Sequence, residues 1–165
     1  MPLDIISKDI TKMEVDAIVN AANTELRNYA PRQGGGVCGA IFRAAGHEQL
    51  QAACDKLAPI ETGQAVITSA FTLPAKYIIH TAGPVWLGGH HGEKALLRSC
   101  YINSLNLAKE NSCESIAFPL ISSGIYKYPT NQALDVARNT IKEWFVNNNM
   151  IVYLCLFGDS FKEVF

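Results

Sequence analysis

The sequence lacks the features that would place it in a membrane or in an oxidising compartment. None of its apolar stretches approaches membrane-spanning length. The first ten residues, MPLDIISKDI, contain neither the basic region nor the long apolar run of a signal peptide. The five cysteines are odd in number, widely spaced and without a CxxC pair, so neither a disulfide framework nor a zinc site is indicated. We therefore expect a cytoplasmic protein that has no membrane partner and no bound metal.

An excess of charge of one sign is also missing. Lys and Arg number 14 against 15 Asp and Glu, which gives a formal net charge of -1. A protein that coats duplex nucleic acid needs a marked basic excess to neutralise phosphates, so no bulk nucleic-acid binding is expected. Hydrophobic residues make up 48% of the chain, an ordinary globular share. Without a repeat, linker or low-complexity tract, the sequence predicts one domain over residues 1–165. We expect this domain to be monomeric or weakly associated.

Short apolar, β-branched runs recur along the chain and predict strands. Most of these runs are continuously apolar, which is typical of strands buried on both faces. Six strands are predicted, at residues 3–7, 16–20, 65–70, 77–82, 115–120 and 151–157. Apolar residues at helical spacing lie between them. The alternation predicts an α/β fold with a largely parallel sheet covered on both faces, in which ligands bind beyond the carboxyl ends of the strands.

Three consecutive glycines, Gly34 to Gly36, stand directly before a predicted amphipathic helix. The apolar stripe of that helix is predicted at Val37, Ala40, Ile41, Ala44 and Ala45. The amides of a helix N-terminus attract anions, and glycines let a diphosphate approach the backbone closely. A flexible turn without a ligand explains the glycines equally well, since neither GxGxxG nor GxxxxGK[ST] is present.

A second glycine turn follows the fifth predicted strand, in the segment LISSGIYKYP. Ser122 and Ser123 offer hydroxyl groups there, and the residues from Gly124 to Tyr126 offer backbone amides. An ordinary strand-to-helix loop would contain the same residues. Two such loops in one α/β domain favour a phosphate ligand, as a single loop would not.

Single polar residues are open to two interpretations each. Asp9 either accepts a hydrogen bond from an exocyclic amine such as that of adenine, or caps a turn. Asn23 either orients a sugar hydroxyl or is a turn residue in the left-handed region. Cys38 stands at a helix N-terminus, which is expected to lower its pKa. His80 lies inside a predicted strand and is expected to be a hydrogen-bonded core residue.

Together these segments resemble one family, the macrodomains. The resemblance covers nearly the whole chain, from DIISKDITKMEVDAIVNAANTEL through GGGVCGAIFRAAG and PAKYIIHTAGPVW to SIAFPLISSGIYKYP. It is nearest to the MacroD-like branch, whose bacterial members bind ADP-ribose and hydrolyse mono-ADP-ribosyl esters and O-acetyl-ADP-ribose. The resemblance implies a three-layer α/β/α sandwich with a mixed, mainly parallel six-stranded sheet, and no cofactor.

The resemblance also implies roles for individual residues. Asp9 would bind the adenine amine with Ile10 in the same pocket, Asn23 would hold the distal ribose, and Phe157 would stack on adenine. Two groups of residues would hold the diphosphate from opposite sides: Gly34, Gly35, Gly36 and Val37 in one group, and Ser122, Ser123, Gly124, Ile125 and Tyr126 in the other.

One departure from the family pattern concerns the chemistry. The MacroD-like branch carries V-D-G-x-I-H after its glycines, with the Asp and His beside the distal ribose, and these positions are Cys38 and Phe42 here. One interpretation is that Cys38 and Phe42 only shape a pocket wall. The other is that Cys38 holds a water or acts as a nucleophile, although no histidine or lysine is evidently placed to take up its proton. Residues 29–33 look like an insertion before the glycines.

The resemblance therefore implies ADP-ribose or an ADP-ribosylated protein as the partner. We expect ester hydrolysis by a water held by Asn23, the Gly35 backbone and the ligand's own phosphate, with Cys38 the third candidate catalytic residue. Loss of general acid–base help costs about 10²- to 10⁴-fold in rate, and positioning supplies much of the remainder. The alternatives are a reader module that binds ADP-ribosyl marks without turnover, and an enzyme for ADP-ribosylated nucleotides or nucleic-acid ends.

Overall fold

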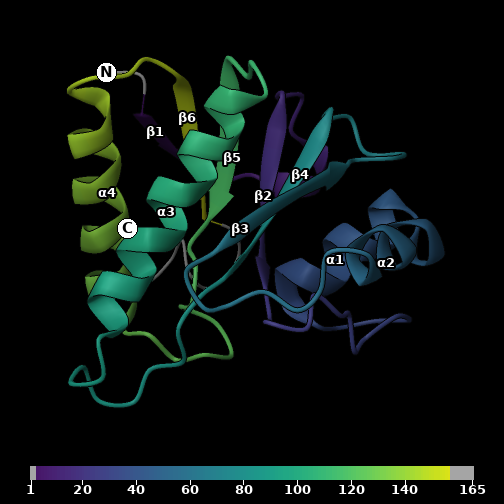
Figure 1. The fold of residues 1–165 in the computed structure, drawn as a ribbon, viewed down its shortest axis with the longest axis horizontal. Helices are drawn as coiled ribbons and strands as arrows, with labels where there is room; N and C mark the ends of the chain where they lie inside the picture. The colour runs from purple at the N-terminus through teal and green to yellow at the C-terminus, as the bar shows by residue number, and fades with distance from the viewer. Residues whose placement is uncertain (1–2, 157–165) are drawn as a thin grey trace.

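A computed structural model describes residues 3–156, and most of its strands are connected by helices (Figure 1). The six strands are β1 (Leu3–Ile6), β2 (Ala17–Ala22), β3 (Ala65–Ser69), β4 (Tyr77–Ala82), β5 (Ser115–Pro119) and β6 (Ile151–Cys155). The helical elements are the 3₁₀ turn η1 (Ile10–Lys12) and the helices α1 (Gly36–Ala45), α2 (His47–Asp55), α3 (Glu93–Glu110) and α4 (Thr130–Phe145). All six predicted strands are present, and their ends lie within about two residues of the predicted ones.

The strands form one sheet in the order β1-β6-β5-β2-β4-β3. Every neighbouring pair is parallel except β3 and β4, which are antiparallel. The prediction of a mixed, mainly parallel six-stranded sheet is confirmed. Within the described part of the chain, no helix is long and apolar enough to cross a membrane.

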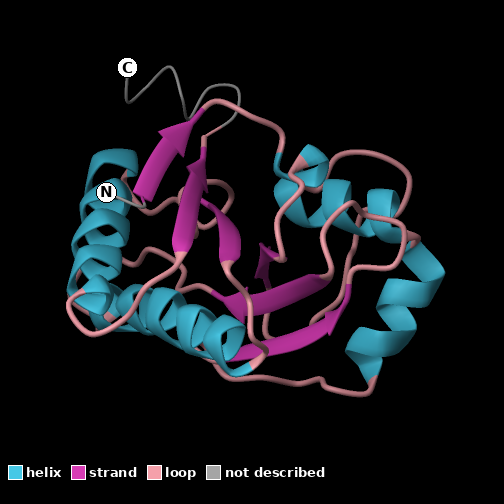
Figure 2. Cartoon of the chain, turned by 90° about the horizontal axis from the view of Figure 1, so that it is seen from above, coloured by secondary structure: helices cyan, strands magenta, loops and turns pink. Residues whose placement is uncertain are grey.

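Helices cover both faces of the sheet, and the strands are apolar on both faces for that reason. Successive strand residues point to opposite faces. Val19 and Ile79 belong to the core cluster that contains α3 and α4, whereas Ile18 and Ile78 belong to the cluster that contains α1 and α2. Figure 2 shows the two helix pairs on either side of the sheet. The three-layer α/β/α sandwich is confirmed.

The buried face of α1 differs from the predicted stripe. Ile41 and Ala45 are buried as predicted, but Val37 and Ala44 are exposed, and Phe42 is buried instead. At about 100° per residue, the buried arc runs from Ile41 through Ala45 to Phe42, and Val37 and Ala44 lie about 40° and 60° outside it, beyond Ile41. The large aromatic ring therefore sets the rotation of the helix, and the prediction, which relied on small apolar residues, was wrong at these two positions.

Candidate functional site

A cavity of about 780 Å³ lies at the carboxyl ends of the parallel strands, where ligands bind in open α/β sheets. Segments that follow β1, β2 and β5, together with the first turn of α1, form most of its wall: residues 8–10, 21–23, 27–30, 35–38 and 119–126. These segments are far apart in the sequence, and the parallel strand order brings them to one edge of the sheet. Both predicted glycine loops therefore line the same cavity.

Most of the predicted site residues line this cavity: Asp9, Ile10, Asn23, Gly35, Gly36, Val37, Cys38, Ser122, Ser123, Gly124, Ile125 and Tyr126. Gly34 is exposed and lies outside the lining. Phe42 is 1% exposed and packs in the core against the rings of His47 and His80, with centroid distances of 5.8 and 6.4 Å. Contrary to the prediction, Phe42 forms no part of the cavity wall. Phe157 lies outside the described residues.

The glycine loop presents the N-terminus of α1 to the cavity. Gly34, Gly35 and Gly36 have φ values of 74°, 73° and 59°, a left-handed conformation that glycine adopts without strain. The first N–H groups of a helix have no partner inside the helix, and Gly35, as the N-cap residue, has no side chain to bind them. These amides and the positive end of the helix dipole are suited to an anion.

The loop after β5 presents a second set of amides to the same cavity. Ser122 has a φ of 67° and is 6% exposed, and its Oγ has no hydrogen-bond partner within residues 3–156. The loop is closed by hydrogen bonds from Tyr128 N to Ser122 O (2.9 Å) and from Lys127 N to Gly124 O (3.0 Å). The amides of residues 124–126 donate no hydrogen bond to another described residue. The cavity therefore has free N–H donors on two sides.

Asp9 combines both of the roles that the sequence left open. Its Oδ1 accepts hydrogen bonds from Thr11 N at 3.0 Å and Thr11 Oγ1 at 2.7 Å, which caps η1. Asp9 also lines the cavity, and a carboxylate has room for further donors. Among the described residues that line the cavity, Asp9 is the only one with a carboxylate, and none is a histidine.

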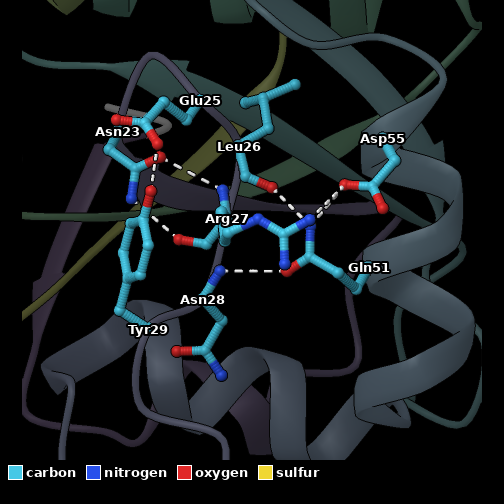
Figure 3. Close-up of polar contacts among 8 residues, drawn as sticks. All are labelled: Asn23, Glu25, Leu26, Arg27, Asn28, Tyr29, Gln51 and Asp55. Atoms are coloured by element: carbon cyan, nitrogen blue, oxygen red, sulfur yellow. Dashed lines mark hydrogen bonds and ion pairs between the residues drawn. The ribbon is translucent and has the colours of Figure 1, made fainter.

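Asn23 closes the turn after β2 through its side chain (Figure 3). Its Nδ2 donates to Arg27 O at 2.8 Å, and its Oδ1 accepts from Arg27 N at 3.1 Å. The left-handed residue of this segment is Leu26, with a φ of 52°, and not Asn23. Each polar atom of the Asn23 amide keeps one further hydrogen-bonding position. Asn23 can therefore contact a ligand in the cavity while it holds the turn.

The Cys38 thiol differs from the prediction. Burial raises the pKa of Cys38, and a hydrogen bond from Asn20 Nδ2, at 3.8 Å, opposes the rise only in part. Asn20 Nδ2 also lies 3.1 Å from Nδ1 of His80. Burial lowers the pKa of His80 to about 3. The expectation of a lowered pKa at the helix N-terminus was wrong, because the loss of hydration on burial raises the pKa of the thiol. The neutral imidazole of His80 is a hydrogen-bonded core residue, as predicted.

Residues 27–30 were not among the predicted residues of the cavity wall. Arg27, Asn28, Tyr29 and Ala30 all line it. Tyr29 is 66% exposed, and its hydroxyl donates to the Glu25 carboxylate, which raises the pKa of Tyr29. The available signal was the polarity of this segment and its overlap with residues 29–33, which look like an insertion.

The arrangement is suited to a ligand that carries an anionic group. Residues with free amides line the cavity in the first turn of α1 and at residues 124–126, and Asp9 and Asn23 follow different strands. In the described chain no group of three or more His, Cys, Asp or Glu residues lies together as a metal site would require. The site is thus suited to anion binding by backbone amides.

Comparison with protein families matches residues 19–137 to the Macro domain. A relative from Citrobacter rodentium, named O-acetyl-ADP-ribose deacetylase, is 48% identical over 159 residues, which cover 93% of this chain and 87% of the relative. The human ADP-ribose glycohydrolase MACROD2 is 52% identical over 142 residues, which cover 86% of this chain but only 32% of that protein. The similarity thus includes both sides of the cavity.

Among solved structures, the macrodomain of Oceanobacillus iheyensis with ADP has a TM-score of 0.85 with this chain. The two sequences are 39% identical, and the match covers 98% of this chain and 88% of the other. The likeness extends over the whole sheet and all four helices.

Proposed function

The chain belongs to the macrodomain family, and we propose that it binds ADP-ribose in the cavity and hydrolyses acyl esters of ADP-ribose, on modified proteins or in O-acetyl-ADP-ribose. The observation that carries the proposal is the presence of free amides on two sides of one cavity, at the N-terminus of α1 and at residues 124–126. A diphosphate between them receives N–H donors from both sides. The names of the relatives from Citrobacter rodentium and human support the substrate class.

The reaction we propose uses water as the nucleophile. Its oxygen attacks the ester carbonyl carbon, the bond from that carbon to the ribose oxygen breaks, and the ribose oxygen takes up a proton. The products are ADP-ribose and a carboxylic acid. Asn23 and the Gly35 backbone hold the water, and a phosphate of the ligand accepts its proton. A protein carboxylate does not take this role, because the only one in the described cavity lining belongs to Asp9, which follows β1, whereas Asn23 follows β2. Positioning and the loop amides supply the remaining acceleration.

The experiment that tests the function is a time course of ADP-ribose release from a protein automodified on Asp and Glu, with this chain well below stoichiometric amount. Release through many turnovers supports the hydrolase. Binding of the modified protein without release, and without hydrolysis of O-acetyl-ADP-ribose, contradicts it and indicates a reader module. The reader is the second candidate because a thiol, Cys38, stands where the related hydrolases of the MacroD-like branch carry an acid.

Replacing Cys38 with serine is expected to leave the turnover number within about threefold of the wild-type value. The thiol has a raised pKa and lies next to Asn20, so it is a poor nucleophile and a weak hydrogen-bond partner for water. The measurement is the rate of O-acetyl-ADP-ribose hydrolysis at saturating substrate. Complete loss of turnover with unchanged ADP-ribose affinity would show that Cys38 attacks the ester itself.

Replacing Asp9 with asparagine is expected to weaken ADP-ribose binding by about 1.5–3 kcal/mol, the usual contribution of a hydrogen bond to a charged group. Asparagine retains an oxygen that caps η1 at Thr11, so the local backbone is maintained. Titration calorimetry measures the affinity. The control ligand is the analogue with inosine in place of adenosine, which lacks the exocyclic amine. The wild-type protein and Asp9→Asn should bind this analogue with nearly the same affinity. If Asp9→Asn loses as much affinity for the analogue as for ADP-ribose, Asp9 does not bind the adenine amine.

A further inference from the structure

The connection from β2 to α1 is held at both ends by side chains from α1 and α2. We call residues 27–34 the cavity loop. At its beginning, Gln51 of α2 accepts a hydrogen bond from Asn28 N (3.0 Å) through Oε1 and donates to Leu26 O (3.0 Å) through Nε2 (Figure 3). Gln51 Nε2 also donates to Asp55 Oδ1 at 2.9 Å, and Asp55 forms an ion pair with Arg27. The beginning of the cavity loop is therefore fixed to α2.

Arg43 of α1 fixes the remainder of the cavity loop. Its Nη1 donates to Ala30 O and to Gly34 O, each at 3.0 Å. One guanidinium nitrogen thus connects the middle of the cavity loop with the glycines at the N-terminus of α1. Side chains of two helices therefore anchor the cavity loop at its beginning, its middle and its end.

Asn28 contains a hydrogen-bond donor that this arrangement leaves unused. The residue is 6% exposed and lines the cavity. Its Oδ1 accepts a hydrogen bond from Ala30 N at 3.0 Å, which also determines which end of the amide is the nitrogen. Its Nδ2 is buried and has no partner within residues 3–156. A buried donor without a partner costs free energy, and a ligand acceptor that reaches it recovers that loss.

The position of Asn28 determines which part of the ligand it meets. It lies in the connection after β2, as Asn23 does, whereas Asp9 follows β1, and β6 and β5 separate these two strands in the sheet. A Cβ built on Gly35 would lie 3.6 Å from Asn28 Oδ1, so Asn28 stands beside the glycine loop. With adenine at Asp9 and the diphosphate at the glycines, Asn28 is at the end of the cavity that takes the distal ribose.

We propose that Asn28 Nδ2 donates a hydrogen bond to an acceptor oxygen at the distal end of the ligand, either a hydroxyl of the distal ribose or the carbonyl of an acyl group attached to it. Asn28 is thereby a specificity-determining residue, which distinguishes ADP-ribose and its esters from ligands that end at the diphosphate. The inference rests on the proposed function, because it takes ADP-ribose as the ligand.

The test compares affinities for ADP-ribose and for ADP, which lacks the distal ribose, by titration calorimetry. Asn28→Asp retains the oxygen that caps Ala30 and replaces the donor by an acceptor. Asn28→Ser is neutral and can still cap Ala30 through its hydroxyl, but it lacks the amide nitrogen. We expect both variants to weaken ADP-ribose binding about tenfold, with the ratio of ADP-ribose to ADP affinity falling by a similar factor. Asn139→Asp, on the exposed side of α4, is the charge-matched control and should change neither affinity.

Each outcome separates the inference from the proposed function. If the wild-type protein binds neither ligand, the proposed function fails, and the inference fails with it. If the wild-type protein binds ADP-ribose and both Asn28 variants keep the wild-type affinity ratio, the inference is wrong and the function stands. A third ligand, ADP-ribose with a stable amide-linked acetyl group on the distal ribose, identifies the acceptor. A larger loss with this ligand than with ADP-ribose indicates the acyl oxygen, and an equal loss indicates a ribose hydroxyl.

Discussion

Replacing Gly39 with alanine is expected to weaken ADP-ribose binding at least about tenfold while the sheet and its helices remain folded. A Cβ at this position of α1 would lie 2.2 Å from Gly34 O and 2.9 Å from Arg43 Nη1. The first contact is with backbone, which cannot rotate away, so the glycine loop has to move. Overpacking of this kind costs about 1–3 kcal/mol. The moved loop no longer presents the amides of α1 to the diphosphate.

The measurements are calorimetric titration with ADP-ribose and the melting temperature of the ligand-free protein. The melting temperature should fall by a few degrees, about 2–4 °C per kcal/mol for a chain of this size. Gly124→Ala is the steric control for the melting temperature, because no heavy atom lies within 4 Å of its added Cβ. If Gly39→Ala binds ADP-ribose with wild-type affinity, the position of the glycine loop does not determine binding.

The fold was predictable because its main features are local in the sequence. Most of the six apolar runs are continuous because helices cover both faces of the sheet, as in the run IVYLC of β6. The antiparallel pairing of β3 with β4 could not be predicted from the apolar runs, because both strands are apolar whichever direction they take. It entered only through the resemblance to the macrodomains.

The candidate site was predictable in part for a similar reason. Two glycine turns after buried strands have to lie at the same edge of a parallel sheet. The wall at Asn28 was not predictable, because its anchors are tertiary: Gln51 lies 23 residues and Arg43 lies 15 residues further along the chain. The acidity of Cys38 was predicted in the wrong direction, since its position at a helix N-terminus is visible in the sequence and its burial beside Asn20 is not.

The protein is expected to lose stability steeply in acid because of His80. This residue is fully buried, and burial lowers its pKa from 6.5 to about 3 in the folded state. Between these two values the unfolded chain binds a proton that the folded protein does not bind. The free energy of unfolding therefore decreases as the pH falls below 6.5, by about 1.4 kcal/mol per pH unit, and the contribution of this one group reaches about 3 kcal/mol at pH 4.

Urea unfolding of the wild-type protein and His80→Gln, at pH values from 7 to 4, isolates this contribution. Glutamine does not titrate, and its amide nitrogen can still donate to Thr68 Oγ1, which lies 3.0 Å from His80 Nε2. A hydrogen bond from Glu114 N lowers the pKa of Asp16, so this carboxylate loses its stabilising effect in acid in both proteins. The free energy of unfolding of His80→Gln should therefore fall less with decreasing pH than that of the wild-type protein, and the difference is the contribution of His80 alone. The variant starts from a lower stability at pH 7. His90→Gln, at an exposed histidine, should keep the wild-type slope. Parallel curves for the wild-type protein and His80→Gln would mean that His80 accepts its proton in the folded core.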